Sequence, residues 1–105
     1  MTRGDIYRVR LPARRGREQH GARYAVVVQA DELLGLSTAI VAPTSRSAGA
    51  AIFRPQIELR GERTRVMVEQ LRALDTERLD DHAGRLSAAE QRAVDEALEL
   101  VLALR

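Results

Sequence analysis

Short apolar runs separated by polar connections extend to about residue 74, and this is the pattern of short β-strands. In the first run, Tyr7, Val9 and Leu11 fall on one face and arginines fall on the other, so one face is expected to be buried. Pro43 is expected to end the third run, and Pro55 places the fourth at a sheet edge or bulge. We predict strands over residues 6–11, 24–29, 37–42, 52–59 and 65–74.

The last part of the chain predicts an amphipathic helix. Ser87 and Glu90 have the S-x-x-E spacing of a capping box. Val94, Leu98 and Leu102 then recur on one helical face. Polar loops are predicted over residues 12–21 and 45–51, and single helical turns over residues 31–36 and 75–79. About five strands and one helix predict a single domain over residues 1–105, mainly β with a C-terminal α-helix, in the form of a small antiparallel barrel or sheet.

The composition excludes several classes of protein. The chain has 105 residues, of which 45% are hydrophobic and 30% charged, as expected of a soluble globular domain. No apolar run approaches the roughly 18–20 residues of a membrane span, and the amino terminus has no apolar signal-peptide core, so we expect a cytoplasmic protein. Because there is no cysteine and there are only two histidines, we expect no disulfide, no metal and no cofactor.

The net charge of +2 hides an uneven distribution along the chain. Residues 1–30 contain seven arginines and two acids, whereas the remaining residues contain ten arginines and thirteen acids. No basic residue is lysine, which a genome that favours arginine codons would also explain. The asymmetry is therefore the stronger signal, and an arginine-rich amino-terminal part fits a polyanionic partner. Aromatic residues make up 3% of the chain, too few for a broad base-stacking surface.

Side chains that carry chemistry gather where two predicted strands begin and end. The glycine-flexed segment 16–24 contains Glu18 and Arg23 and leads into an apolar run, and the next run is followed by Thr44 and Ser45. If the two runs are neighbouring antiparallel strands, these polar ends meet at one edge of the sheet. A guanidinium, a carboxylate and a hydroxyl together can hold a phosphate and move a proton, with neither a metal nor a cysteine.

Five motifs in one order make the sequence resemble the MazF/PemK (Kid-like) toxin family of type II toxin–antitoxin systems. They lie at residues 3–7, 16–23, 44–45, 69–75 and 84–87. The first is similar to the family's R-G-D/E-I/L-W/Y, and the second matches G-x-E-Q-x-G-x-R-P except at its last position. The third falls at a strand-end T-S/T, and the fourth is similar to D/E-Q-I/V-R-T/S-I-D. The fifth leads into the terminal helix.

The resemblance implies an SH3-like small barrel of the MazF/PemK/CcdB type, and a homodimer formed by the sheet and part of the helix over residues 88–104. It also implies a sequence-specific, metal-independent endoribonuclease that cuts single-stranded messenger RNA and so stops translation and growth. Such cleavage uses the 2′-hydroxyl of RNA as nucleophile and leaves 2′,3′-cyclic phosphate and 5′-hydroxyl ends. A cognate antitoxin would silence the toxin by laying an acidic and apolar tail across its arginine-rich loops.

The resemblance also implies roles for individual residues. Arg23 is the best candidate to stabilise the extra negative charge on the phosphate, and Thr44 would bind a phosphate oxygen or orient the 2′-hydroxyl. Glu18 is the leading general base, although neighbouring arginines lower its basicity and leave a purely electrostatic role open. Glu69 is the second candidate base. The residues expected to position RNA are Arg17, Gln19, Ser45 and Gln70.

Three positions depart from the family pattern. Tyr24 replaces the proline that normally follows the arginine, and Pro43 lies one place later than the proline of many relatives. Met67 stands where some relatives have a second catalytic arginine. Arg23 is therefore expected to act largely alone.

Two other functions stay open. A toxin of the same fold can act without catalysis by binding a protein such as DNA gyrase, and a degenerate member can bind only RNA or its antitoxin. The intact segment 16–23 favours the nuclease, because a protein-binding toxin needs no loop that activates a phosphate. The residues Tyr24 and Met67 keep the degenerate alternative open.

Overall fold

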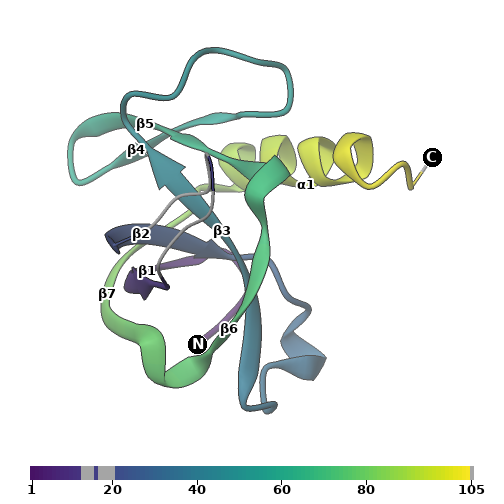
Figure 1. Ribbon diagram of the computed structural model, residues 1–105. Coiled ribbons are helices and arrows are strands. Elements are labelled where there is room, and N and C mark those ends of the chain that lie inside the picture. The colour runs from purple at the N-terminus through teal and green to yellow at the C-terminus, as the bar shows by residue number, and fades with distance from the viewer. Residues whose placement is uncertain (13–15, 17–20, 105) are drawn as a thin grey trace.

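A computed structural model describes residues 1–12, 16 and 21–104 and shows a curled sheet with one long helix beside it (Figure 1). Its strands are β1 (Asp5–Leu11), β2 (Gly21–Val27), β3 (Thr38–Ser45), β4 (Gln56–Leu59), β5 (Glu62–Val66), β6 (Arg72–Asp75) and β7 (Leu79–Arg85). The long helix is α1 (Ala88–Val101), and the single 3₁₀ turns are η1 (Asp31–Leu33), η2 (Val68–Gln70) and η3 (Thr76–Arg78). The predicted class, mainly β with a C-terminal helix, is confirmed.

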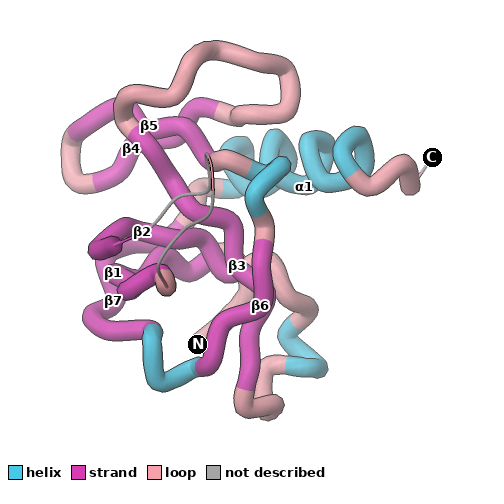
Figure 2. Tube along the Cα trace, viewed as in Figure 1, coloured by secondary structure: helices cyan, strands magenta, loops and turns pink. Residues whose placement is uncertain are grey.

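Strand β3 joins the two parts of the sheet. The strand order is β4-β5-β3-β2-β1-β7, and β6 pairs with β3 as well. The first half of β3, from Thr38 to Val41, pairs with β6, whereas Thr44 and Ser45 at its end pair with β5. The sheet therefore forks at β3, and it curls into a half-barrel (Figure 2).

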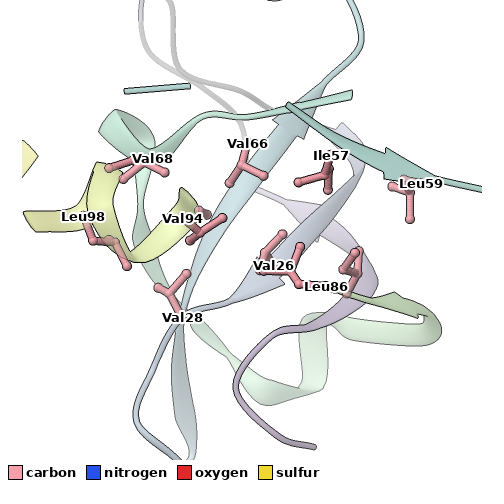
Figure 3. Packing of buried hydrophobic residues seen from close by; sticks show 12 residues of the cluster. Val26, Val28, Ile57, Leu59, Val66, Val68, Leu86, Val94 and Leu98 are labelled. Carbon is pink, nitrogen blue, oxygen red and sulfur yellow. The ribbon is translucent and has the colours of Figure 1, made fainter. Parts of the chain in front are cut away.

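Two hydrophobic clusters lie on opposite faces of this sheet. In β2, Val26 belongs to the cluster beneath α1, whereas its neighbours Ala25 and Val27 belong to the other cluster, as strand alternation requires. Val94 and Leu98 of α1 pack into the first cluster against residues of the sheet and of η2 (Figure 3). Burying one valine or leucine contributes about 1.5–3 kcal/mol, so this apolar face holds the helix in place.

Helix α1 begins at the predicted capping box. The Ser87 hydroxyl accepts a hydrogen bond from the Glu90 backbone N–H at 3.1 Å, and the Glu90 carboxylate accepts one from the Ser87 N–H at 2.9 Å. The second carboxylate oxygen of Glu90 accepts the Glu58 N–H of β4 at 2.8 Å. An ion pair of 2.7 Å between Arg3 and Asp95 ties the amino terminus to the same helix. Helix α1 is thus bound to β4 at its start and to the segment before β1 at its middle.

Pro43 does not end the third strand, as the sequence predicts, but lies inside β3 opposite Ala25 of β2. Its carbonyl accepts the Met67 N–H at 2.8 Å. The N–H and C=O of one strand residue face the same side, so the missing N–H of proline would also face that side. There the partner of β3 changes from β6 to β5, and the Met67 carbonyl on that side accepts the Gln70 N–H instead.

Two predicted strands are too long. The strand predicted over residues 52–59 begins only at Gln56, because residues 51–54 close a turn in which the Ala51 carbonyl accepts the Arg54 N–H. The extended segment predicted over residues 65–74 is two strands, since the chain turns through η2 between Val66 and Arg72. The interruption brings β5 and β6 to opposite halves of β3.

The sequence predicts two of the turns between strands correctly, but it does not predict the last strand. The turns predicted over residues 31–36 and 75–79 are confirmed as η1 and η3, and the Asp75 side chain caps η3 by accepting the Glu77 N–H. Strand β7 was not predicted, because most of its side chains are exposed and no apolar alternation marks it. Among the described helices, none is long and apolar enough to cross a membrane.

Candidate active site

A cavity of about 610 Å³ opens where β2 begins and β3 ends. Arg23 and Tyr24 line it from β2, and Thr44 and Ser45 line it from β3. The hairpin formed by β4 and β5 contributes the opposite wall. The prediction that the polar ends of these two strands meet at one edge of the sheet is therefore confirmed.

Thr44 is fixed by the neighbouring strand. Its hydroxyl donates a hydrogen bond to the Tyr24 carbonyl at 3.0 Å, and only 4% of the residue is exposed. A threonine hydroxyl has one hydrogen, so this bond leaves acceptor lone pairs for a ligand. The Tyr24 side chain packs against the cluster beneath α1. The residue that replaces the proline of the family pattern is thus a fixed part of the cavity wall.

Positive charge exceeds negative charge around the cavity. The guanidinium groups come from Arg8, Arg23, Arg46 and Arg60, and Glu62 is the one acid among the lining residues that the structure describes. Arg46 forms an ion pair with Glu62, which connects the segment after β3 to the β4–β5 hairpin. The other three guanidiniums give the cavity a net positive potential that attracts an anion.

Three of these arginines, Arg8, Arg46 and Arg60, were not predicted from the sequence. Arg8 lies opposite Tyr24 in the β1–β2 ladder, and the alternation that assigned it to the exposed face of β1 also places it at the cavity. Arg60 and Gly61 form the hairpin tip with φ of 53° and 81°, as two-residue hairpin turns require. Gly61 predicts the turn, but no local signal places Arg60 at the cavity.

The other predicted site residues are dispersed. Ser45 lines the cavity, with its Oγ 3.2 Å from that of Ser47. Glu69 and Gln70 belong to η2 and are not among the lining residues. Instead, Arg54 binds Oε2 of Glu69 through two nitrogens, at 2.6 and 2.7 Å. The predicted residues that lie outside the described part of the chain are Arg17, Glu18 and Gln19.

Met67 is a core residue in this structure. It is 5% exposed and does not line the cavity. Near the site, the backbone N–H of Met67 donates a hydrogen bond to the carbonyl of Pro43, the residue before Thr44. Position 67 therefore supports the end of β3 without a charged side chain.

A second charged cluster, the Asp5 corner, consists of Thr2, Asp5, His82 and Arg85. Burial raises the pKa of Asp5, but the Thr2 N–H, His82 and Arg85 all bond its carboxylate and together hold the pKa below its usual value. Burial and the nearby Asp5 charge raise the pKa of Tyr7, whose ring meets that of His82 edge-on. In the described part of the chain, no three acidic or histidine side chains gather closely enough to hold a metal ion.

Two proteins of similar sequence match almost the full chain. Endoribonuclease MazF9 of Mycobacterium tuberculosis is 38% identical over 116 aligned positions, which cover 99% of this chain and 98% of that protein. Endoribonuclease EndoA of Bacillus subtilis is 35% identical over 111 positions, covering 99% and 96%. The fold is also that of a solved mycobacterial endoribonuclease in complex with its cognate antitoxin, with a TM-score of 0.86, 17% identity and coverage of 100% and 97%.

The family itself follows from a match along nearly the whole sequence. Residues 2–102 fit the sequence profile of the PemK-like, MazF-like toxins of type II toxin–antitoxin systems. The matched region includes both strand ends at the cavity and all of α1. This chain is therefore a member of the PemK-like, MazF-like toxin family.

Proposed function

We propose that the chain is a sequence-specific endoribonuclease toxin that cuts single-stranded messenger RNA in the cytoplasm and thereby stops translation. Two relatives at 38% and 35% identity are named endoribonucleases. The observation that carries the proposal is the cavity in which Arg23 and the fixed hydroxyl of Thr44 lie on adjacent strands, with further arginines in the same lining. This arrangement suits a phosphodiester whose charge increases during the reaction.

The reaction begins with the 2′-hydroxyl of the RNA. Its oxygen attacks the adjacent phosphorus while a general base takes its proton. The bond between phosphorus and the 5′-oxygen of the next nucleotide breaks, and that oxygen takes a proton from water. The products are a 2′,3′-cyclic phosphate and a 5′-hydroxyl, and DNA is not cut because it lacks the nucleophile. No metal is required for any of these steps.

Arg23 and Thr44 take different parts in this reaction. The guanidinium of Arg23 binds two phosphate oxygens and stabilises the charge of the pentacoordinate transition state. Thr44 already donates its hydroxyl hydrogen to the Tyr24 carbonyl, so it accepts a hydrogen bond from the ligand. The 2′-hydroxyl is a donor and the ionised phosphate oxygens are not. Thr44 therefore orients the nucleophile in the bound substrate, before the single hydrogen of the 2′-hydroxyl turns to the general base.

The general base is Glu18 in this proposal. The other candidate, Glu69, is bound by Arg54 and does not line the cavity. Glu62 does line it, but Arg46 pairs with its carboxylate. The RNA on either side of the cut is positioned by Arg17, Gln19, Ser45 and Gln70, and by the cavity residues Arg8 and Arg60.

The charge of the cavity also suits a protein partner. The solved mycobacterial endoribonuclease is in complex with its cognate antitoxin. For this chain we propose an antitoxin whose acidic and apolar tail covers the cavity and excludes RNA by occupying the same guanidiniums.

A homodimer completes the proposed assembly. The end of α1 and the residues after it expose Leu100, Leu102 and Leu104 to 52%, 47% and 66%. Several large apolar side chains exposed over so short a stretch are candidates for a surface that another chain covers. We therefore place part of the dimer interface at this end of the helix, together with the sheet.

Cleavage of a long RNA by the purified protein tests the function. The wild type should cut the RNA with and without a chelator, and Arg23→Ala should lower the rate by at least roughly 100-fold because a charge-stabilising group is lost. Arg92→Ala removes an exposed arginine of α1 that does not line the cavity, and it should cut normally. An inert wild type, or equal rates for Arg23→Ala and Arg92→Ala, would contradict the proposal.

A gyrase-binding toxin would give a different result. It would leave RNA intact and bind purified gyrase with the same affinity whether Arg23 is present or not. Cleavage that depends on Arg23 excludes that alternative and the degenerate RNA-binding alternative together.

A further inference from the structure

The segment between β3 and β4, residues 46–55, forms one side of the cavity mouth. It extends beyond the sheet as a long loop (Figure 1). Arg46 and Ser47 at its start line the cavity, but residues 48–51 are alanines and one glycine, with little side chain to hold them. Arg46 and Ser47 are held at one end of the loop by Glu62 and Ser45, so the residues that follow need a contact of their own if the loop is to keep one conformation.

Arg54 supplies that contact from the far end of the loop. Its Nε and a terminal nitrogen bind Oε2 of Glu69 at 2.7 and 2.6 Å, and the other terminal nitrogen donates to the Gly49 carbonyl at 3.3 Å. The guanidinium also lies 5.4 Å from the centre of the Phe53 ring. One side chain thus holds the middle of the loop, the end of the loop and η2 together.

Glu69 is a firm anchor because η2 is itself fixed. The Val68 side chain is fully buried, and the N–H of Met67 donates to the Pro43 carbonyl at 2.8 Å. Pro43 directly precedes Thr44, so a closed ring of contacts runs from the end of β3 through η2 and Arg54 to Gly49. From Gly49 the chain leads back to Ser47 and Arg46, which line the cavity.

We propose that the Arg54–Glu69 ion pair is a positioning pair that sets the cavity wall made by Arg46 and Ser47. The inference rests on the proposed function for its effect on RNA, but not for its effect on the loop. It gives Glu69 a role that differs from the general base expected from the sequence. Neither member of the pair touches the RNA; both act through the loop.

The burial of the pair gives this contact its strength. The side chains of Arg54 and Glu69 are 24% and 25% exposed, so water screens the pair less than an open surface pair. Oε1 of Glu69 is buried and has no hydrogen-bond partner among the described residues, so this carboxylate depends on Arg54. The core clusters do not include either residue. Loss of the pair should therefore loosen the loop without unfolding the protein.

A spin label measures the loop directly. The chain has no cysteine, so Ala50→Cys, at an exposed loop position, accepts one nitroxide. Adding Glu69→Gln or Arg54→Lys should shorten the rotational correlation time of the label at least about twofold, because the ion pair that Arg54 makes through two nitrogens is lost. The double variant Arg54→Glu with Glu69→Arg restores opposite charges and should recover part of the wild-type value.

A matched control separates this effect from general loosening. Asp95→Asn removes the Arg3–Asp95 pair, which has similar exposure, 28% and 40%, but ties the amino terminus to α1. It should leave the label at residue 50 as immobile as in the wild type. Equal mobility in all variants, or an equal increase in Asp95→Asn, would overturn the proposal.

Kinetics with a short RNA test the consequence for the site. Glu69→Gln and Arg54→Lys should raise KM by roughly tenfold while kcat stays within about twofold, because the displaced wall weakens RNA binding and the Arg23 chemistry is intact. A fall in kcat with unchanged KM would instead make Glu69 a catalytic group and overturn the inference. If the wild type cuts no RNA, the proposed function fails, and the spin label still decides whether the pair fixes the loop.

Discussion

Strand β1 takes part in two charged clusters that are built in opposite ways. At the Asp5 corner, the carboxylate of a residue that is 7% exposed receives hydrogen bonds from Thr2 and Arg85, and its charge is neutralised within the fold. At the cavity, Arg8 and three other arginines face a single acid. One cluster is closed to a ligand and the other has unmatched positive charge.

The difference separates charge that stabilises the fold from charge that binds. A buried carboxylate with several donors favours the folded state, because each bond is lost on unfolding. Unmatched guanidiniums repel one another, and a protein keeps them together at a cost to its stability. We therefore expect substitutions at the Asp5 corner to change stability and substitutions at the cavity to change RNA binding.

The largest effect should come from breaking the Asp5 corner. Asp5→Asn removes the charge that Arg85 and the Thr2 N–H bind, and should lower the free energy of unfolding by about 2 kcal/mol, the scale of hydrogen bonds to a charged group. Urea unfolding at neutral pH measures this change. Asp81→Asn, an exposed position on the same strand as Arg85, should cost less than about 0.5 kcal/mol. Similar losses for both variants would mean that the corner is not a stabilising site.

Acid should remove the same stabilisation in the wild type. The pKa of Asp5 lies below its ordinary value of 3.8, so the folded state favours the ionised carboxylate. That contribution is complete above the unfolded-state pKa, about 3.9, and is lost as pH falls through the lower folded-state value. The stability difference between wild type and Asp5→Asn should therefore shrink between neutral pH and about pH 3. A constant difference would show that the charge of Asp5 is not its cause.

A smaller effect is expected from single arginines of the cavity. Each phosphate contact to single-stranded nucleic acid contributes about 0.7 to the slope of log affinity against log salt concentration. Arg8→Gln and Arg60→Gln should each lower that slope by about this amount, and Arg92→Gln should not. Fluorescence anisotropy with a 2′-O-methyl RNA, which cannot be cut, gives the slope. If Arg8→Gln leaves it unchanged, the guanidinium contacts no phosphate.

The smallest effect concerns the one acid of the cavity. Glu62→Gln releases Arg46 from its ion pair and removes a repulsive charge, so RNA should bind about threefold more tightly, within the usual energy of an exposed pair. Stability should hardly change. Weaker binding would indicate instead that the Glu62 carboxylate itself contacts the RNA.

The parts of the fold that local chemistry specifies could be predicted. The capping box of α1 depends on two residues three positions apart, and the Asp75 cap of η3 likewise needs only neighbours in the chain. Strand β7 has no such signal. Its pairing with β1 is held by the backbone ladder and by the Asp5 corner. In that corner, His82 and Arg85 lie 77 and 80 positions from Asp5 along the chain.

The site shows the same limit. Arg23 and Thr44 could be placed together because one precedes an apolar run and the other follows the next run, and adjacent antiparallel strands bring such ends together. The partner of Glu69 could not be predicted, since Arg54 is 15 positions away across a loop with no periodic pattern. The family motif identifies an acid at that position, but only the fold shows that a guanidinium already binds it.

The narrow fork in the sheet makes the β4–β5 hairpin an exchangeable module. Only Thr44 and Ser45 pair it to β3, and Ile57 and Leu59 seat it in the core beneath α1. The tip consists of Arg60 and Gly61, and its Arg60 lines the cavity. An engineer could therefore graft tips of other lengths and charges between fixed anchors, and so build a set of ribonucleases that differ in the RNA they choose while sharing one scaffold.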